Sequence, residues 1–230
     1  MADVRLVEVF SSLQGEGPFL GERQVFVRLG GCNLHCDYCD EPDTIPMDSG
    51  SPALLAEAEA KVDALLSQRP HASVSVTGGE PLIQAGFLAA FLPGIQARGL
   101  RTHLETNGTL AQALRRVVGA VDVVAMDIKL PSATGRETWA AHREFLSVAP
   151  GRTFVKVVVT DRTSAEEIEL AAALVRETAP QAPFLLQPAT PCAGVRPPPP
   201  RRLLDWSRRI RPLLPQAAVV PQWHPLWGLP

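Results

Sequence analysis

This chain has few cysteines, little excess charge and no long apolar run, and each scarcity excludes a class of protein. Four cysteines among 230 residues do not fit the disulfide framework of small secreted domains. A formal net charge of −2 leaves no basic footprint for a polynucleotide, so no nucleic-acid partner is expected. Without a membrane-length apolar run or a signal-like N-terminus, we expect no membrane partner and a cytoplasmic location with reduced cysteines.

What is present describes an ordinary globular protein. Hydrophobic residues make up 46% and charged residues 20% of the chain, and the length suits one compact domain. We therefore predict a single domain over residues 1–230. The last residues carry Trp223 and Trp227, too aromatic for a disordered end, so this tail is expected to pack onto the body.

Three of the four cysteines, Cys32, Cys36 and Cys39, fall within eight residues. Four thiolates would complete a structural zinc site or an ordinary iron–sulfur cluster. Three in one loop, with no obvious fourth nearby, would leave one iron of a 4Fe–4S cluster open to an exogenous ligand. The spacing therefore predicts a redox enzyme.

A zinc loop, a strained disulfide and chance spacing are the alternatives. A zinc site would need a fourth ligand, and His35 lies between Cys32 and Cys36. We do not expect one short loop to turn all four side chains onto one metal. Cys192 is interpreted as a non-ligand, because free cysteines commonly behave as small hydrophobes.

Apolar, β-branched runs alternate with segments of helical period. Near-continuous apolar runs are typical of strands buried on both faces of a parallel sheet. The predicted strands are Gln24–Leu29, Ser73–Thr77, Arg101–Glu105, Val121–Asp127, Thr153–Thr160 and Phe184–Gln187. The predicted helices are Pro52–Gln68, Ala85–Arg98, Leu110–Val118, Arg136–Ser147, Ala165–Thr178 and Pro200–Arg211. Thr134 with Glu137, and Ser164 with Glu167, have capping-box spacing. The fold class is thus α/β, an incomplete TIM-like barrel with about six parallel strands and flanking helices.

Polar motifs follow the predicted strands where each strand ends. The cysteine loop follows the first and Thr77–Pro81 the second, and Glu105–Gly108 ends the third. Asp127–Lys129 ends the fourth and Gln187–Thr190 the sixth. In parallel α/β folds these ends share one face, where ligands bind. Any one motif could be a turn, but together they outline a site.

The motifs resemble those of radical S-adenosylmethionine (SAM) enzymes. Cys32, Cys36 and Cys39, with Tyr38 before the last cysteine, look like the superfamily's cluster signature, and Thr77–Pro81 looks like its methionine-binding motif. The start, Phe10–Gly17, and the ending, His224–Pro230, are similar to those of the 7-carboxy-7-deazaguanine synthases of the queuosine and deazapurine pathway. The resemblance covers essentially the whole chain.

The resemblance implies a lyase that contracts the ring of 6-carboxy-5,6,7,8-tetrahydropterin to 7-carboxy-7-deazaguanine, with loss of ammonia. It implies a 4Fe–4S cluster on Cys32, Cys36 and Cys39, and SAM bound to the open iron as the source of a radical. The SAM-binding residues it implies are Tyr38, Gly79, Glu80, Glu105, Asp127, Ile128, Lys129, Gln187, Pro188, Ala189 and Thr190. Here Asp-Ile-Lys stands at 127–129 where the family usually has Ser-Pro-Lys.

The substrate-binding residues implied by the resemblance are Leu13, Gln14, Gly15, Arg28, Thr77 and Pro230. Arg28 would pair with the pterin carboxylate, and the carboxylate of Pro230 would accept from its guanidine-like edge. Mg2+ is a further implied cofactor. The family's Thr ligand directly after Cys-Asp is replaced by Glu41, with Thr44 three positions later; either is a competent ligand.

Two other functions stay open. One is an activase that abstracts hydrogen from a glycine of another protein, because such enzymes share the cysteine loop. The other is a non-enzymatic binding module stapled by zinc. The resemblance also implies a flavodoxin-like or ferredoxin-like reductant and a homodimer.

Overall fold

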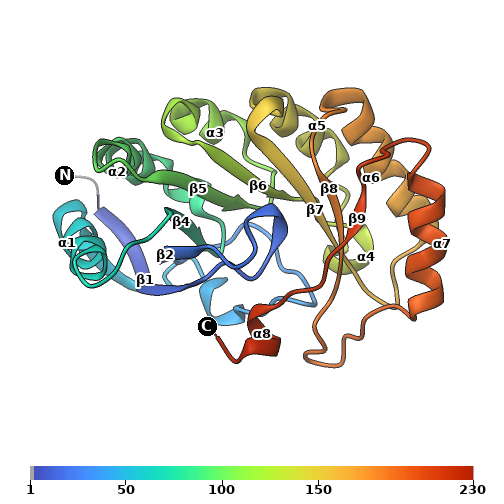
Figure 1. The fold of residues 1–230 in the computed structure, drawn as a ribbon, viewed down its shortest axis with the longest axis horizontal. Coiled ribbons are helices and arrows are strands. Elements are labelled where there is room, and N and C mark those ends of the chain that lie inside the picture. The colour runs from blue at the N-terminus through green and yellow to red at the C-terminus, as the bar shows by residue number, and fades with distance from the viewer. Residues whose placement is uncertain (1–2, 230) are drawn as a thin grey trace.

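The computed structural model describes residues 3–229, and a nine-stranded sheet runs through it in the order β3-β1-β2-β4-β5-β6-β7-β8-β9. From β2 to β8 the neighbouring strands are parallel. The sheet curves but does not close (Figure 1). The strands are β1 Asp3–Leu13, β2 Arg23–Leu29, β3 Ser51–Leu54, β4 Ser73–Gly78, β5 Arg101–Thr106, β6 Val123–Asp127, β7 Thr153–Val159, β8 Phe184–Pro188 and β9 Ala218–Val219. The predicted incomplete barrel of six parallel strands is confirmed.

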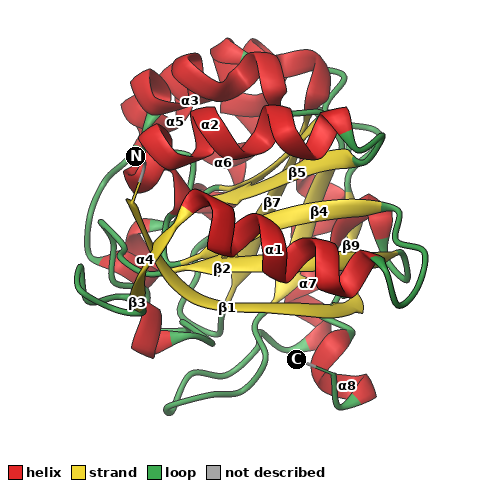
Figure 2. Ribbon diagram, turned by 90° about the vertical axis from the view of Figure 1, so that its left-hand side faces the viewer, coloured by secondary structure: helices red, strands yellow, loops and turns green. Residues whose placement is uncertain are grey.

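Helices cover the outer, convex face of the sheet, as Figures 1 and 2 show. This layer consists of α1 Leu55–Leu66, α2 Ala85–Ala97, α3 Ala111–Val117, α5 Trp139–Val148, α6 Ala165–Thr178 and α7 Pro200–Ile210. The one-turn α4 Pro131–Thr134 packs against the cysteine loop, and α8 spans His224–Trp227. The short α8 instead lies on the concave side (Figure 1). No described helix is both long enough and apolar enough to span a bilayer.

Three strands were not predicted, and each lacks the continuous apolar run of the parallel core. Strand β1 pairs antiparallel with β2 and with β3, so it sits at the margin of the parallel core. The helix expected from Pro52 begins only at Leu55, because residues 51–54 form β3. Strand β9 has just two residues.

Of the two predicted capping boxes, one forms. Ser164 Oγ accepts from the Glu167 amide at 3.2 Å, and the Glu167 carboxylate accepts from the Ser164 amide at 2.9 Å. The box at Thr134 was wrong. Thr134 instead ends α4, and α5 begins only at Trp139, because Gly135 at a φ of 66° caps α4 and turns the chain.

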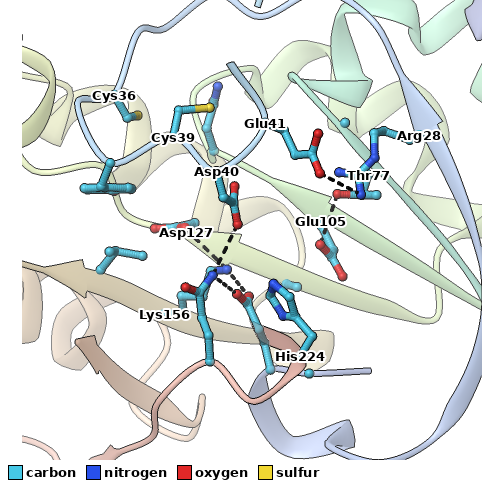
Figure 3. A pocket seen from close by; sticks show the side chains of 18 of the residues that line it. Arg28, Cys36, Cys39, Asp40, Glu41, Thr77, Glu105, Asp127, Lys156 and His224 are labelled. Carbon is cyan, nitrogen blue, oxygen red and sulfur yellow. Dashed lines mark hydrogen bonds and ion pairs between the residues drawn. The ribbon is translucent and has the colours of Figure 1, made fainter. Parts of the chain in front are cut away.

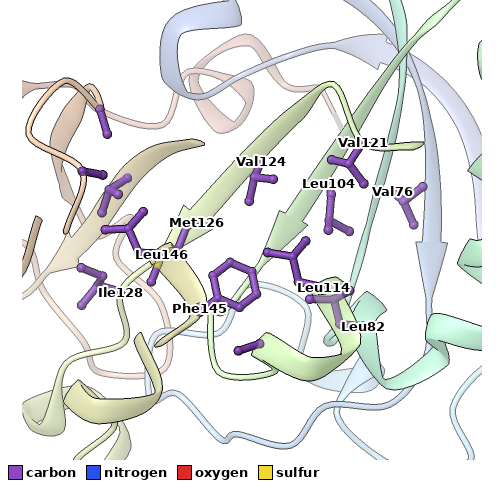
Figure 4. Packing of buried hydrophobic residues seen from close by; sticks show 14 of the residues in the cluster. Val76, Leu82, Leu104, Leu114, Val121, Val124, Met126, Ile128, Phe145 and Leu146 are labelled. Carbon is purple, nitrogen blue, oxygen red and sulfur yellow. The ribbon is translucent and has the colours of Figure 1, made fainter. Parts of the chain in front are cut away.

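The main core lies between the sheet and this helical layer (Figure 4). Leu104 and Met126 from the strands pack with Leu114 of α3 and Phe145 of α5 in a cluster of fully buried side chains. Truncating one such side chain to alanine costs about 2–5 kcal/mol. This rigid layer fixes where the strands end, and therefore where the polar motifs stand.

Candidate active site

A single pocket of about 390 Å³ opens at the carboxyl ends of the parallel strands. The cysteines lie at one end of it, and Arg28, Thr77 and Glu105 at the other (Figure 3). Strands β2, β4, β5, β6 and β7 each contribute a lining residue. The pocket therefore lies on the ligand-binding face that parallel α/β folds use.

Backbone hydrogen bonds hold the cysteine loop over this pocket. Cys32 N–H donates to the Ile45 carbonyl at 3.0 Å, and Asp37 N–H donates to the Ala133 carbonyl at 3.0 Å. The three thiols are free and partly buried, and all three line the pocket. Burial raises the pKa of Cys36 to about 11, so this thiol is protonated at neutral pH until a metal takes its sulfur.

This donor set fits a cluster held by three protein ligands. Cys192 does not line the pocket and instead packs beside a small apolar cluster that contains Tyr38 and Val195. Among residues 3–229 no three His, Cys, Asp or Glu side chains are gathered as a metal site.

The wall beside the cysteines has unpaired polar atoms that suit a polar ligand. Lys129 Nζ donates to Asp127 Oδ2 at 2.8 Å and lies 5.1 Å from the centre of the Tyr38 ring. Within residues 3–229, the other Asp127 oxygen and the Tyr38 hydroxyl are buried and have no hydrogen-bond partner. Buried polar atoms are normally paired, so these two are suited to the predicted SAM site.

Glu80 is the buried support of this end rather than a lining residue. Its carboxylate accepts from the Thr106 hydroxyl at 2.9 Å, the Asn107 amide at 2.7 Å and the Leu82 amide at 3.0 Å. Burial raises its pKa from 4.5 to about 7, although these hydrogen bonds oppose the shift. Glu80 thus ties β4 to β5 behind the pocket.

Packing explains why residue 79 is a glycine, in addition to the ligand contact expected there. A Cβ at this position would lie 2.3 Å from the Gly31 carbonyl oxygen. Only glycine allows the cysteine loop and the Gly-Gly turn to approach so closely.

Arg28 dominates the other end of the pocket. Its Nε donates to Glu8 at 2.8 Å, one terminal nitrogen lies 3.1 Å from Glu41, and its guanidinium stacks over Phe10. Nearby, Glu105 accepts from Gln14 at 3.0 Å and from Thr77 at 3.1 Å. A fixed cation and an oriented carboxylate therefore face the same space.

The described side chains do not form the predicted Mg2+ site. Thr44 is buried, does not line the pocket, and donates its hydroxyl to the Glu41 carbonyl at 2.7 Å. Glu41 lines the pocket but is paired with Arg28. Burial raises the pKa of Glu41, although the charge of Arg28 opposes the shift.

Most of the predicted site residues meet in this one pocket. Those that line it are Leu13, Gln14, Gly15, Arg28, Cys32, Cys36, Tyr38, Cys39, Glu41, Thr77, Gly79, Glu105, Asp127, Lys129, Ala189 and Thr190. Those that do not are Thr44, Glu80, Ile128, Gln187 and Pro188. Pro230 lies outside the described residues.

Sequence reasoning missed a buried ion pair on the pocket floor. Lys156 of β7 pairs with Glu16, and its Nζ lies 3.6 Å from Asp127. Burial alone would raise the pKa of Glu16, but the charge of Lys156 and hydrogen bonds from Lys156 and Gln222 lower it to about 2. Glu16 is therefore a permanent anion and not a general base at neutral pH. The one available signal was a lysine inside an otherwise apolar strand.

The pocket's outer wall comes from the tail. A tail packed onto the active site was expected, but Pro230 was the one tail residue named as part of the site. Gln222, His224, Pro225 and Leu229 line the pocket. The Trp223 amide donates to the Gly15 carbonyl at 2.9 Å. A Cβ on Gly15 would lie 2.6 Å from His224 Nδ1, so glycine is needed for the tail to seat.

Comparison with known proteins places these features in one family. Residues 26–157 match the family model described as the Radical SAM superfamily. The chain is 37% identical to a 7-carboxy-7-deazaguanine synthase of Geobacter sulfurreducens over 97% of this chain and 96% of that protein. It is 33% identical to one of Methanothermobacter thermautotrophicus over 97% of each.

A solved structure supports the same fold. The crystal structure of QueE from Escherichia coli superposes with a TM-score of 0.62 at 21% identity, and the match covers 94% of this chain and 93% of that one.

Proposed function

Because the chain belongs to the radical SAM superfamily and to its 7-carboxy-7-deazaguanine synthases, we propose that it converts 6-carboxy-5,6,7,8-tetrahydropterin to 7-carboxy-7-deazaguanine. The proposed reaction releases ammonia and makes the enzyme a carbon–nitrogen lyase. The superfamily implies a 4Fe–4S cluster and SAM as its cofactors.

The observation that carries this proposal is one continuous pocket with two unlike ends. Three free thiols lie at one end, and the Arg28 guanidinium lies at the other. A carboxylated pterin bound to Arg28 would extend toward the cysteine loop. The guanidinium favours a carboxylate because it can donate two parallel hydrogen bonds.

When bound, the cluster and SAM supply the radical chemistry. The residues of the chain orient and enclose the reactants. Asp127, Lys129 and Tyr38 bind the cofactor side, and Arg28 with Thr77 binds the substrate side. Phe10, Phe26, Phe154 and Leu229 line the pocket and exclude water from the reacting atoms.

The proposal contains no step on Mg2+, because the described residues do not form a site for it. It treats residues 1–230 as a single radical SAM domain whose C-terminal segment forms part of the active site. A one-electron donor of the flavodoxin or ferredoxin kind and a homodimeric assembly complete the proposal.

Anaerobic turnover tests the function. The reconstituted enzyme, the pterin, SAM and a reductant should yield 7-carboxy-7-deazaguanine and ammonia in equal amounts. A fully clustered enzyme that cleaves SAM but makes no deazaguanine would contradict the proposal.

A protein substrate is the competing possibility, and the tail argues against it. Residues 222–229 close one side of the pocket, which leaves a space of small-molecule size. Release of ammonia from the pterin distinguishes the two functions directly.

A further inference from the structure

Gln222 joins three segments that are far apart in the sequence. Its Nε2 donates to Glu16 Oε1 at 2.7 Å and to Asp40 Oδ2 at 3.3 Å. Its Oε1 accepts from the Thr190 hydroxyl at 2.5 Å. One side-chain amide therefore bonds the tail to the N-terminal loop, to the segment after the last cysteine and to the chain beyond β8.

Glu16 is held by contacts besides the one from Gln222. It also accepts from Gln187 at 3.0 Å and pairs with Lys156. Both of its oxygens therefore accept hydrogen bonds within the protein. A buried carboxylate with its charge neutralised makes a fixed acceptor, and hydrogen bonds to a charged group are about twice as strong as neutral ones.

Beyond Gln222, the tail places His224, Pro225 and Leu229 on the pocket. Among residues 3–229, the other hydrogen bonds of this segment are made by its backbone. The Trp223 amide donates to the Gly15 carbonyl, while the amides of Trp227 and Leu229 donate within the tail. Leu226 and Trp227 are exposed. Within the described chain, Gln222 and the adjacent Trp223 amide therefore supply the hydrogen bonds that join this segment to the rest of the protein.

We propose that Gln222 is a positioning residue that latches residues 222–229 over the pocket, and that this latch sets the affinity for the substrate. The inference rests on the proposed function only for the identity of the substrate. The latch requires an amide. A carboxylate at position 222 would face Glu16 and Asp40. An apolar side chain of the same length would take away the acceptor of the Thr190 hydroxyl and one of the donors to Glu16.

The first experiment follows the tail without turnover. Hydrogen–deuterium exchange of residues 222–229 should be about 10-fold or more faster in Gln222→Met than in the parent, since hydrogen bonds to a charged group are worth roughly 10-fold or more in an equilibrium constant. Gln222→Glu should exchange faster still, because the added charge repels the tail. Gln216→Met is the matched control. Gln216 is exposed and donates to the Pro180 and Ala182 carbonyls. In this variant, residues 222–229 should exchange at the rate of the parent.

The second experiment separates positioning from loss of structure. In Gln222→Met the KM for the pterin should rise about 10-fold, while SAM cleavage without pterin should change less than about 2-fold. The midpoint of thermal unfolding should stay close to that of the parent. Parent-like exchange and a parent-like KM in both Gln222 variants would overturn the latch.

The two proposals can fail separately. If the parent makes no deazaguanine but Gln222→Met loosens the tail, the latch stands and the function is wrong. If the parent makes product while the tail of Gln222→Met stays protected, the function stands and the latch is wrong.

Discussion

The two ends of the pocket are built in different ways. The cysteine end comes from residues 32–39 with Gly79, Asp127 and Lys129, all inside the segment that matches the radical SAM family model. The other end adds residues 13–16 and 222–229, from outside that segment, to Arg28, Thr77 and Glu105 from within it. The chemistry shared by the superfamily thus lies in a contiguous block, whereas closure of the substrate end depends on contacts between distant parts of the chain.

The two ends also differ in the pKa shifts of their glutamates, Glu80 and Glu16. Glu80, behind the cysteine end, is fully buried, and burial raises its pKa to about 7 although hydrogen bonds and the charge of Lys129 oppose the shift. Burial would also raise the pKa of Glu16, at the other end, but its direct ion pair with Lys156 lowers it to about 2. The shifts are opposite because Glu16 has a cation in direct contact, whereas Glu80 is bonded by neutral donors.

The largest predicted effect is the loss of both SAM cleavage and substrate turnover when one cluster ligand is removed. Cys36→Ala should abolish SAM cleavage and product formation, because the cluster would lose one of its three ligands. Iron and sulfide content and 5′-deoxyadenosine release are the measurements. Cys192→Ala, a control outside the pocket, should retain both activities. Full activity in Cys36→Ala would refute the assignment of the cluster ligands.

A smaller effect should distinguish the substrate end of the pocket from the cysteine end. Arg28→Ala should lower pterin turnover about 30-fold or more, the value of a charge-assisted pair with a carboxylate. SAM cleavage without pterin should change less than about 3-fold, because the cysteine end is intact. Rates of product and 5′-deoxyadenosine formation distinguish the two.

The matched control for Arg28 is Arg101→Ala. Arg101 forms an ion pair with Glu22 at 2.6 Å and does not line the pocket, so its loss should leave both rates near those of the parent. Equal losses of both rates in Arg28→Ala would show a structural role instead.

The last predicted effect concerns the dependence of stability on pH and leaves both ends of the pocket in place. The folded protein holds the proton of Glu80 more tightly than the unfolded chain, so its contribution should fall by about 3 kcal/mol as pH rises from 4.5 to 7. The pKa of Glu16 is lowered instead, so its contribution is present above pH 4.5 and is lost as pH falls toward 2.

Both effects can be checked by measuring the free energy of unfolding in urea for Glu80→Gln and Glu16→Gln between pH 2 and pH 7. Glu80 governs the limb of the stability curve between pH 4.5 and 7, and Glu16 governs the limb below pH 4.5. Each variant should lose the pH dependence of one limb and keep that of the other. A parent-like slope between pH 4.5 and 7 in Glu80→Gln would contradict the assignment of that limb.

Most of the sheet was predictable because its strands carry a local signal. Runs such as residues 153–159 are apolar on both faces, and that pattern belongs to a buried parallel strand. Strands β3 and β9 carried no such signal, because pairing with β1 and β8 rather than their own residues makes them strands. Tertiary context decided these elements.

The site divides in the same way. Cys32, Gly79 and Asp127 lie in short motifs, and each lines the pocket. Lys156 and Gln222 are single polar residues with no motif, and their partners lie 140 and 206 residues away in the chain. Thr44 was misplaced because its hydroxyl turns back onto the chain at Glu41, a local geometry that spacing alone does not reveal.

The wall formed by residues 222–229 also has a consequence for biosynthesis. These residues leave the ribosome after every strand of the sheet and after the whole cysteine loop. Until residues 222–229 have folded against the body, the pocket lacks this side of its lining. The three thiols are therefore most accessible before this segment is seated.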